Sequence, residues 1–137
     1  MNKFNFLLGD WDLDYRIPDS SFGKAGTDKG TGSFRKALNE KYVIFEYNTE
    51  SGGAAMGIFA RDDRINAYRY WWFENSGSFL PATCNFIDDN TLAMNWHDTQ
   101  LVQTFVRESP GRVILTMSHP LPGNRYQTVL EVIMTKR

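Results

Sequence analysis

The sequence has few of the residues that usually point directly to catalysis or metal binding. It contains one cysteine, Cys84, and two histidines, His97 and His119. A single cysteine excludes an internal disulfide, and without a nucleophile motif Cys84 is expected to pack as a small apolar residue. These three residues are scattered and lack the spacing of metal ligands, so we expect no metal site. His97 is interpreted as a strand-end residue that faces water.

Charge excess and long apolar runs are also missing. A net charge of −1 provides no basic surface, which argues against nucleic acid as a partner. No apolar run approaches the roughly 18 residues of a membrane-spanning helix. The N-terminal residues lack a signal peptide's apolar region and cleavage site, and together with the lone cysteine this predicts a cytoplasmic protein without a membrane partner. The glycine-containing segment Asp19–Gly32 leads into Ser33–Arg35, not into a helix, so we expect no nucleotide and no other cofactor.

Aromatic residues, in contrast, are abundant at 15% of the 137 positions. The length suits one domain, residues 1–137. Large flat side chains bury much area with few rotatable bonds, so they are suited to lining a cavity. They are equally suited to filling a small β core, and both interpretations remain open from the sequence.

The clearest periodic pattern is Asp10–Ile17. It alternates strictly between Trp11, Leu13, Tyr15 and Ile17 on one side and charged residues on the other, which predicts a strand with one buried face. The apolar segment Phe4–Leu8 before it is interpreted as a helical turn or a plug over the end of a barrel.

The most aromatic run, Ile65–Phe73, is predicted to be a long strand. Alternation places Tyr68, Tyr70 and Trp72 on one face, while Arg69 and Trp71 share the other. Both faces carry large aromatic rings, which suits the wall of a barrel with one face inside and the other against a partner.

Short strands recur along the whole chain, with turn residues between them and no helical period. This series predicts an all-β fold, an up-and-down antiparallel barrel of about ten strands, because closure removes exposed strand edges. Besides a glycine-containing strand around residues 30–35, the predicted strands are 10–17, 42–48, 54–61, 65–73, 78–86, 91–97, 101–107, 112–118 and 126–134, and residues 119–124 are predicted to form a loop.

Several short motifs resemble a known family. Phe6–Trp11 resembles the opening of lipocalin-like (calycin) barrels, where a glycine and a tryptophan begin the first strand. A bacterial family of lipocalin-like proteins of uncharacterised function is similar at Gly30-x-Gly32-x-Phe34, Tyr42–Tyr47, Asp62 and Tyr68-x-x-x-Trp72-Phe73-Glu74-Asn75-x-Gly77. The resemblance runs from about residue 6 to 77 and implies a single lipocalin-like β-barrel domain without naming an activity. Family members generally have Asp at the position of Glu74.

The candidate ligand-binding residues are the aromatic side chains expected inside the barrel and two acids near them: Tyr15, Glu46, Tyr68, Tyr70, Trp72, Glu74 and Trp96. Glu46 and Arg69 are charged residues within apolar strands. For Glu46, a cavity-facing position and an outer position remain open, whereas the outer wall is favoured for Arg69. No residue is assigned a catalytic role.

Three functions are compatible with this pattern. The first is binding of a small apolar or aromatic molecule inside the barrel. The second is an isomerase or cyclase that uses polar residues of the same cavity. The third is an interaction module that forms a homodimer through the outer aromatic face. A carboxylate with a raised pKa beside a tyrosine or histidine would favour the enzyme, whereas a cavity of aromatic and aliphatic side chains would favour binding.

Overall fold

The structure is a computed structural model that describes residues 1–20 and 24–137, which form ten strands and one short 3₁₀ helix, η1 (Asn2–Leu7). The strands are β1 (Gly9–Ile17), β2 (Gly26–Ala37), β3 (Tyr42–Thr49), β4 (Ala54–Asp62), β5 (Ala67–Glu74), β6 (Phe79–Asp88), β7 (Thr91–Trp96), β8 (Val102–Ser109), β9 (Arg112–Leu121) and β10 (Arg125–Lys136).

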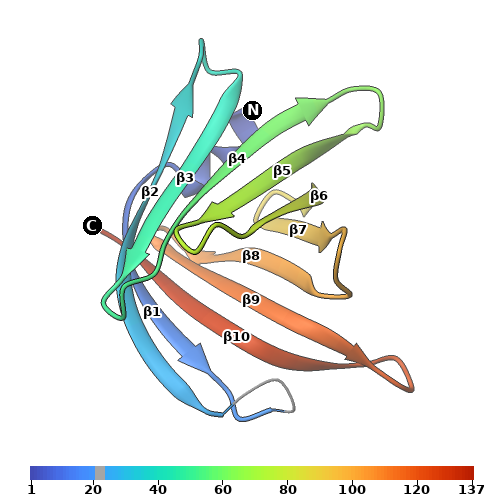
Figure 1. Ribbon diagram of the computed structural model, residues 1–137. Coiled ribbons are helices and arrows are strands. Elements are labelled where there is room, and N and C mark those ends of the chain that lie inside the picture. The colour runs from blue at the N-terminus through green and yellow to red at the C-terminus, as the bar shows by residue number, and fades with distance from the viewer. Residues whose placement is uncertain (21–23) are drawn as a thin grey trace.

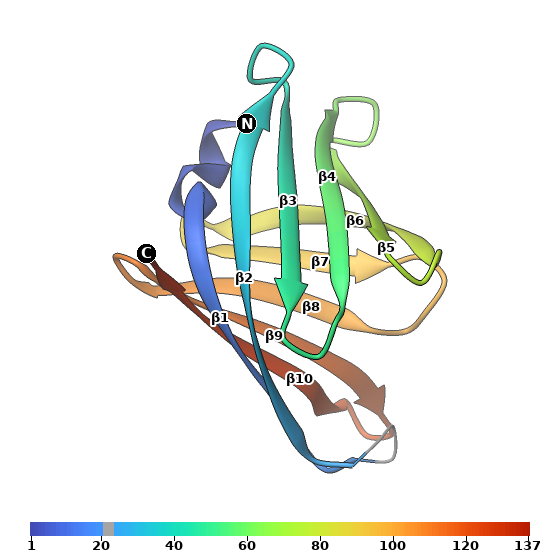
Figure 2. The same ribbon diagram turned by 60° about the vertical axis from the view of Figure 1, so that its left-hand side comes forward.

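Each strand pairs with the next one in the sequence, and β1 also pairs with β10, which closes the barrel (Figure 1, Figure 2). All of these pairings are antiparallel, and in the closing ladder Leu13 lies opposite Met134. The predicted all-β, up-and-down antiparallel barrel is therefore confirmed. Among the described residues no helix is long and apolar enough to cross a membrane.

Several predicted element boundaries differ from the structure, and β2 begins at Gly26 instead of near residue 30. β5 begins at Ala67 because Asn66, with φ of 51°, belongs to the preceding turn. The predicted loop at 119–124 is mostly strand, since His119 pairs with Gln127 and Leu121 pairs with Arg125. Pro120 is tolerated there because β8 accompanies β9 only as far as Ser118, so one neighbouring ladder has already ended.

The alternation in β1 follows the prediction except at its last residue. Trp11 and Leu13 are buried and Tyr15 is half-buried, whereas Asp10 and Asp12 are exposed. Ile17 is 37% exposed, which corrects the expectation that it shares the buried face. It lies at the end of the barrel opposite Gly26, whose lack of a side chain leaves nothing to pack against.

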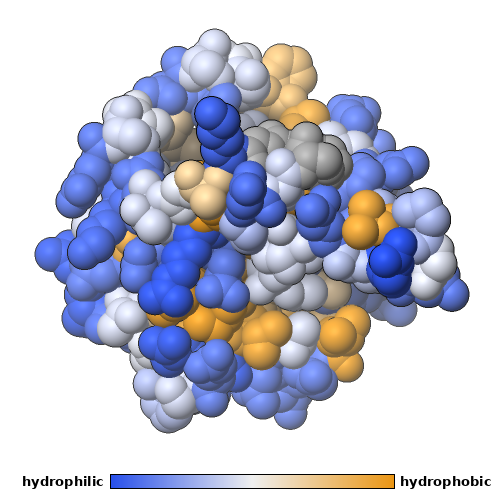
Figure 3. All heavy atoms as spheres, turned by 90° about the horizontal axis from the view of Figure 1, so that it is seen from below, coloured by the Kyte–Doolittle hydropathy of each residue, from blue (hydrophilic) through white to orange (hydrophobic). Residues whose placement is uncertain are grey.

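The two ends of the barrel differ. η1 covers one end, where the Phe4 ring lies 4.9 to 5.1 Å from the rings of Phe59, Tyr68 and Phe86. The indole N–H of Trp11 fastens this cap by donating to the Leu7 carbonyl at 2.7 Å. The β9–β10 hairpin and the end of β1 lie at the opposite end in both ribbon views (Figure 1, Figure 2). Seen from below, the surface is mostly hydrophilic with separate hydrophobic patches (Figure 3).

A three-residue ion-pair cluster holds the β4–β5 hairpin. The buried carboxylate of Asp62 accepts from Arg64 at 2.9 Å and from Arg69 at 2.7 Å. These hydrogen bonds, that of Arg64 first, lower the pKa of Asp62 from its ordinary value. Arg69 alternates along β5 with the buried Tyr68 and Tyr70, so it lies on the outer wall, as predicted.

Gly57 in β4 makes room for the ring of Tyr70 inside the barrel. A Cβ at this position would overlap the hydroxyl and ring atoms of Tyr70. Tyr70 is only 3% exposed and packs against Phe59 at 4.3 Å between ring centroids, so its ring has little room to move away from a new Cβ at position 57. The absence of a side chain at Gly57 is thus a condition for the inward position of Tyr70.

Replacing Gly57 by Ala is expected to lower the free energy of unfolding by about 1–3 kcal/mol, the usual cost of overpacking a core. Urea denaturation followed by tryptophan fluorescence measures the change. Gly26→Ala is the matched control, because a Cβ there meets no atom within 4 Å. Equal stability of the two variants would contradict this account of Gly57.

Candidate functional site

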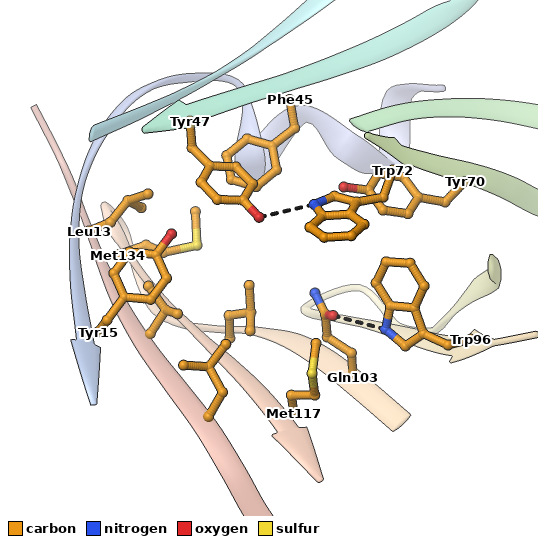
Figure 4. A pocket seen from close by; sticks show the side chains of 13 residues that line it. Leu13, Tyr15, Phe45, Tyr47, Tyr70, Trp72, Trp96, Gln103, Met117 and Met134 are labelled. Atoms are coloured by element: carbon orange, nitrogen blue, oxygen red, sulfur yellow. Dashed lines mark hydrogen bonds between the residues drawn. The ribbon is translucent and has the colours of Figure 1, made fainter. Parts of the chain in front are cut away.

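A cavity of about 70 Å³ lies inside the barrel, and none of its lining residues comes from η1 (Figure 4). Its walls come from strands all round the barrel. The 13 lining residues are Leu13, Tyr15, Phe45, Tyr47, Tyr70, Trp72, Trp96, Gln103, Leu115, Met117, Leu130, Val132 and Met134.

Strand alternation explains why these residues meet. Paired lining positions are two residues apart on β1, β3, β5, β9 and β10, so their side chains point the same way. Because the barrel is closed, this shared direction points into its interior on each of these strands. Each intervening residue, such as Trp71 between Tyr70 and Trp72, faces outward.

Two tryptophans hold the polar side chains of the cavity in place. The indole N–H of Trp72 donates to the Tyr47 hydroxyl at 3.0 Å, and that of Trp96 donates to Oε1 of Gln103 at 3.2 Å. The two indoles also pack edge to face at 6.1 Å. These contacts fix the rotamers of Tyr47 and Gln103 and so fix the direction in which their remaining polar atoms point.

Burial keeps the cavity tyrosines protonated. Desolvation is the main cause that raises the pKa of Tyr15, Tyr47 and Tyr70, because water no longer stabilises the phenolate. Among the described residues no group hydrogen-bonds the hydroxyl of Tyr70, which belongs to the lining of the cavity. Near neutral pH these side chains are hydrogen-bonding phenols and carry no charge.

Negative charge lies at the margin of the cavity. Asp28 is opposite Tyr15 in the β1–β2 ladder, and Glu74 ends β5 beyond Trp72. Desolvation is the largest cause of the raised pKa of Tyr15 and Tyr47. The carboxylate of Asp28 makes a smaller contribution to the raised pKa of Tyr15, and that of Glu74 makes a smaller contribution to that of Tyr47. The side chain of Asp28 accepts from Ser51, and that of Glu74 accepts from Ser76.

Four of the residues predicted to form the site line the cavity together. Tyr15, Tyr70, Trp72 and Trp96 come from β1, β5 and β7 and surround one space (Figure 4). Ligand binding by these residues stays a prediction.

The other three predicted site residues lie elsewhere. Tyr68 does point into the barrel, but it packs under η1 against Phe4 and does not line the cavity. Glu46 is on the outer wall, where its carboxylate pairs with Arg35 at 3.0 Å, because its position in β3 alternates with the buried Phe45. Glu74 is on the inward side of β5, at the strand end, outside the group of lining residues.

Tyr47 and Gln103 were missed as site residues. Tyr47 follows Val43 and Phe45 at a spacing of two, which was a usable signal within the predicted strand 42–48. Gln103 shares the face of Phe105 in an apolar strand, and a polar residue at such a position needs a buried partner. The sequence gives no reason to connect either residue with a tryptophan some 7 to 25 positions away.

The cavity provides a few hydrogen-bonding groups among apolar side chains, without charged or metal-binding groups among its described lining residues. None of its 13 described lining residues is a carboxylate, histidine, lysine or arginine. Across residues 1–20 and 24–137, no three His, Cys, Asp or Glu side chains gather as metal ligands would. Cys84 is buried outside the cavity, and burial raises the pKa of its thiol to about 12.

Comparisons with known proteins support the fold alone. No family model and no curated protein matches the sequence. The crystal structure of Rv2717c from M. tuberculosis is similar over 100% of this chain and 98% of that chain, with a TM-score of 0.67 and 9% identity. A de novo designed fluorescence-activating β-barrel is similar over 100% of this chain and 99% of its own, with a TM-score of 0.46 and 10% identity. The likeness to Rv2717c shows a shared ten-stranded barrel architecture.

The raised tyrosine pKa values predict that the protein loses stability in alkali. A phenol that keeps its proton in the folded state contributes stability that is fully present below the unfolded value of 10.0 and is lost as pH rises toward the folded value. Tyr70→Phe is expected to make the decline above pH 10 shallower by up to about 1.4 kcal/mol per pH unit. Urea denaturation between pH 8 and pH 11.5 measures the slopes. Tyr126→Phe removes an exposed hydroxyl as a control, and identical slopes for wild type and Tyr70→Phe would refute the assignment.

Proposed function

We propose that the protein binds a small apolar or aromatic molecule in the cavity of its barrel. The observation that carries this proposal is the lining itself: six aromatic side chains, a few placed polar groups and no charged residue among the described walls. Ligand sites have this composition, because apolar contacts supply affinity and a few hydrogen bonds fix orientation.

Cavity size sets a condition on the ligand. At about 70 Å³ the cavity is smaller than the roughly 150 Å³ of an engineered protein cavity that takes up benzene. Met117, Met134 and Leu130 form part of its wall, and methionine side chains rearrange readily around a guest. A ligand with one ring is therefore expected to enter by displacing these flexible side chains.

The isomerase or cyclase hypothesis has less support. Proton transfer near neutral pH needs a group that titrates there. The ionisable groups among the described lining residues are the phenols of Tyr15, Tyr47 and Tyr70, whose pKa is raised. They are equipped to donate hydrogen bonds to a bound molecule.

We also propose that the chain is a lipocalin-like barrel that works in the cytoplasm. The motifs between residues 6 and 77 support the first part. Cys84, buried and free, supports the second, because a disulfide-free chain suits a reducing compartment. Cell fractionation with an antibody against the protein tests the location, and recovery outside the cytoplasm would exclude it.

Trp72→Ala is expected to separate a ligand cavity from simple core packing. If Trp72 borders a cavity, the variant loses less than the about 3–5 kcal/mol of a fully buried aromatic and binds the ligand more weakly. Thermal melts and titration with monocyclic aromatic probes, followed by NMR, measure both effects. Phe4→Ala is the control, since Phe4 is fully buried under the cap away from the cavity; it should lose stability and retain affinity.

A second site-directed test enlarges the cavity. Met117→Ala removes wall volume, so a one-ring probe should bind more tightly than it does to wild type. Native mass spectrometry of the protein purified without added ligand shows whether it carries a molecule from the cell. Absence of probe binding to both wild type and Met117→Ala would exclude the proposed function.

The outer face of β4–β6 favours a homodimer as a second candidate function. Met56, Trp71, Phe73 and Phe79 are 39%, 40%, 44% and 69% exposed, respectively, and form an outer apolar patch. They are neighbours across strands, because Met56 pairs with Phe73, and Phe73 pairs with Phe79. An exposed apolar patch of this kind is typical of interfaces and supports the proposal that a second copy of the chain covers it.

Sedimentation equilibrium tests the dimer. Wild type is expected to sediment as a dimer and Phe79→Glu as a monomer, because a charge in an apolar interface lacks a partner. Tyr126→Glu adds the same charge at a residue that is 61% exposed on β10, outside the patch, and should leave the dimer intact. A monomeric wild type at high concentration would exclude this candidate.

A further inference from the structure

The polar atoms of the cavity are biased toward hydrogen-bond donors. An indole N–H can only donate, so Trp96 requires the carbonyl oxygen of Gln103 and turns the amide nitrogen the other way. Figure 4 shows that nitrogen directed into the cavity. No described residue accepts a hydrogen bond from it, although Gln103 is only 6% exposed.

Tyr47 is constrained in the same way. Its hydroxyl oxygen accepts from Trp72, which leaves the O–H of Tyr47 to donate. In Figure 4 this hydroxyl and the Gln103 amide border the same space from opposite walls. Trp72 and Trp96 thereby occupy an acceptor on Tyr47 and Gln103, respectively. Both of these residues then present hydrogen-bond donors to the cavity.

The charges around the cavity disfavour anionic ligands, and the hydrogen-bond donors inside it disfavour cationic ones. No described lining residue offers a cation to an anionic ligand, and Asp28 and Glu74 place negative charge at the margin. A cationic ligand would find donors that it cannot satisfy. A buried ion without a partner is costly, so a neutral ligand fits best.

We propose that the cavity selects neutral molecules with a carbonyl-type acceptor oxygen, which receives hydrogen bonds from the Gln103 amide and the Tyr47 hydroxyl. This inference rests on the proposed binding function and narrows it. The remaining wall, of Phe45, Leu115, Val132 and the methionines, contacts the apolar body of the ligand.

Four probes of nearly equal shape test the proposal. Acetophenone carries a neutral carbonyl, α-methylstyrene replaces its oxygen by CH₂, benzoate is the anion and benzamidinium is the cation. Binding is followed through the indole N–H resonances of the four tryptophans. Those of Trp72 and Trp96 are expected to shift, while those of Trp11 and Trp71, which lie outside the cavity, serve as internal references.

Acetophenone is expected to bind about tenfold more tightly than α-methylstyrene, the scale of one or two net hydrogen bonds, and more tightly than either ion. In Gln103→Glu, whose ionised carboxylate keeps an acceptor for Trp96 but has no hydrogen to donate, the preference for acetophenone should disappear at a pH where the new side chain is ionised. Gln100→Glu makes the same change at an exposed position and should leave the preference unchanged. Should Gln103→Glu fail to fold, Tyr47→Phe tests the second donor and should reduce the preference.

The outcomes separate the two proposals. Equal affinity for acetophenone and α-methylstyrene, or tighter binding of either ion, would overturn the donor-based selectivity and leave ligand binding in place. If no probe shifts the indole resonances of Trp72 and Trp96, in wild type or in Met117→Ala, the binding function itself fails and the selectivity fails with it.

Discussion

Closure of the sheet by the β1–β10 ladder is the constraint on which the rest of the structure depends. The ladder runs from Trp11 opposite Lys136 to Arg16 opposite Glu131 and joins the two ends of the chain. Without it, two long strand edges would be exposed and the inward side chains would have no opposite wall. With it, alternate residues of all ten strands become neighbours, which creates both the core and the cavity.

The interior is divided along the barrel axis. Near η1, the ring of Phe4 packs against the rings of Phe59, Tyr68 and Phe86. Farther from η1, polar side chains are held by indole donors and leave a gap between them. The packed end stabilises the barrel. The other end can therefore hold hydrogen-bond donors that no protein group accepts from. These donors cost stability, and a bound ligand or water would offset that cost.

The proposed function follows from this division. The likeness to Rv2717c shows a shared fold and says nothing about function, because one barrel fold can carry many functions. Ligand binding is therefore inferred from the site, where Trp72 and Trp96 orient Tyr47 and Gln103 toward a space without a described charged wall residue. The outer apolar patch around Trp71 and Phe79 is a separate feature, on the opposite face of β5 and its neighbours.

The sequence by itself determined the fold class and the direction of most side chains, because alternation is local and a strand has a period of two. It correctly placed Trp11 and Tyr70 inside and Arg69 outside. It did not determine how far along the barrel each inward residue lies, which depends on register between strands. Tyr68 and Tyr70 are two residues apart on one face, yet one packs under η1 and the other borders the cavity. Only the tertiary structure decided that Tyr47 meets Trp72 and Gln103 meets Trp96, since these contacts arise when ladders and closure bring separate strands together.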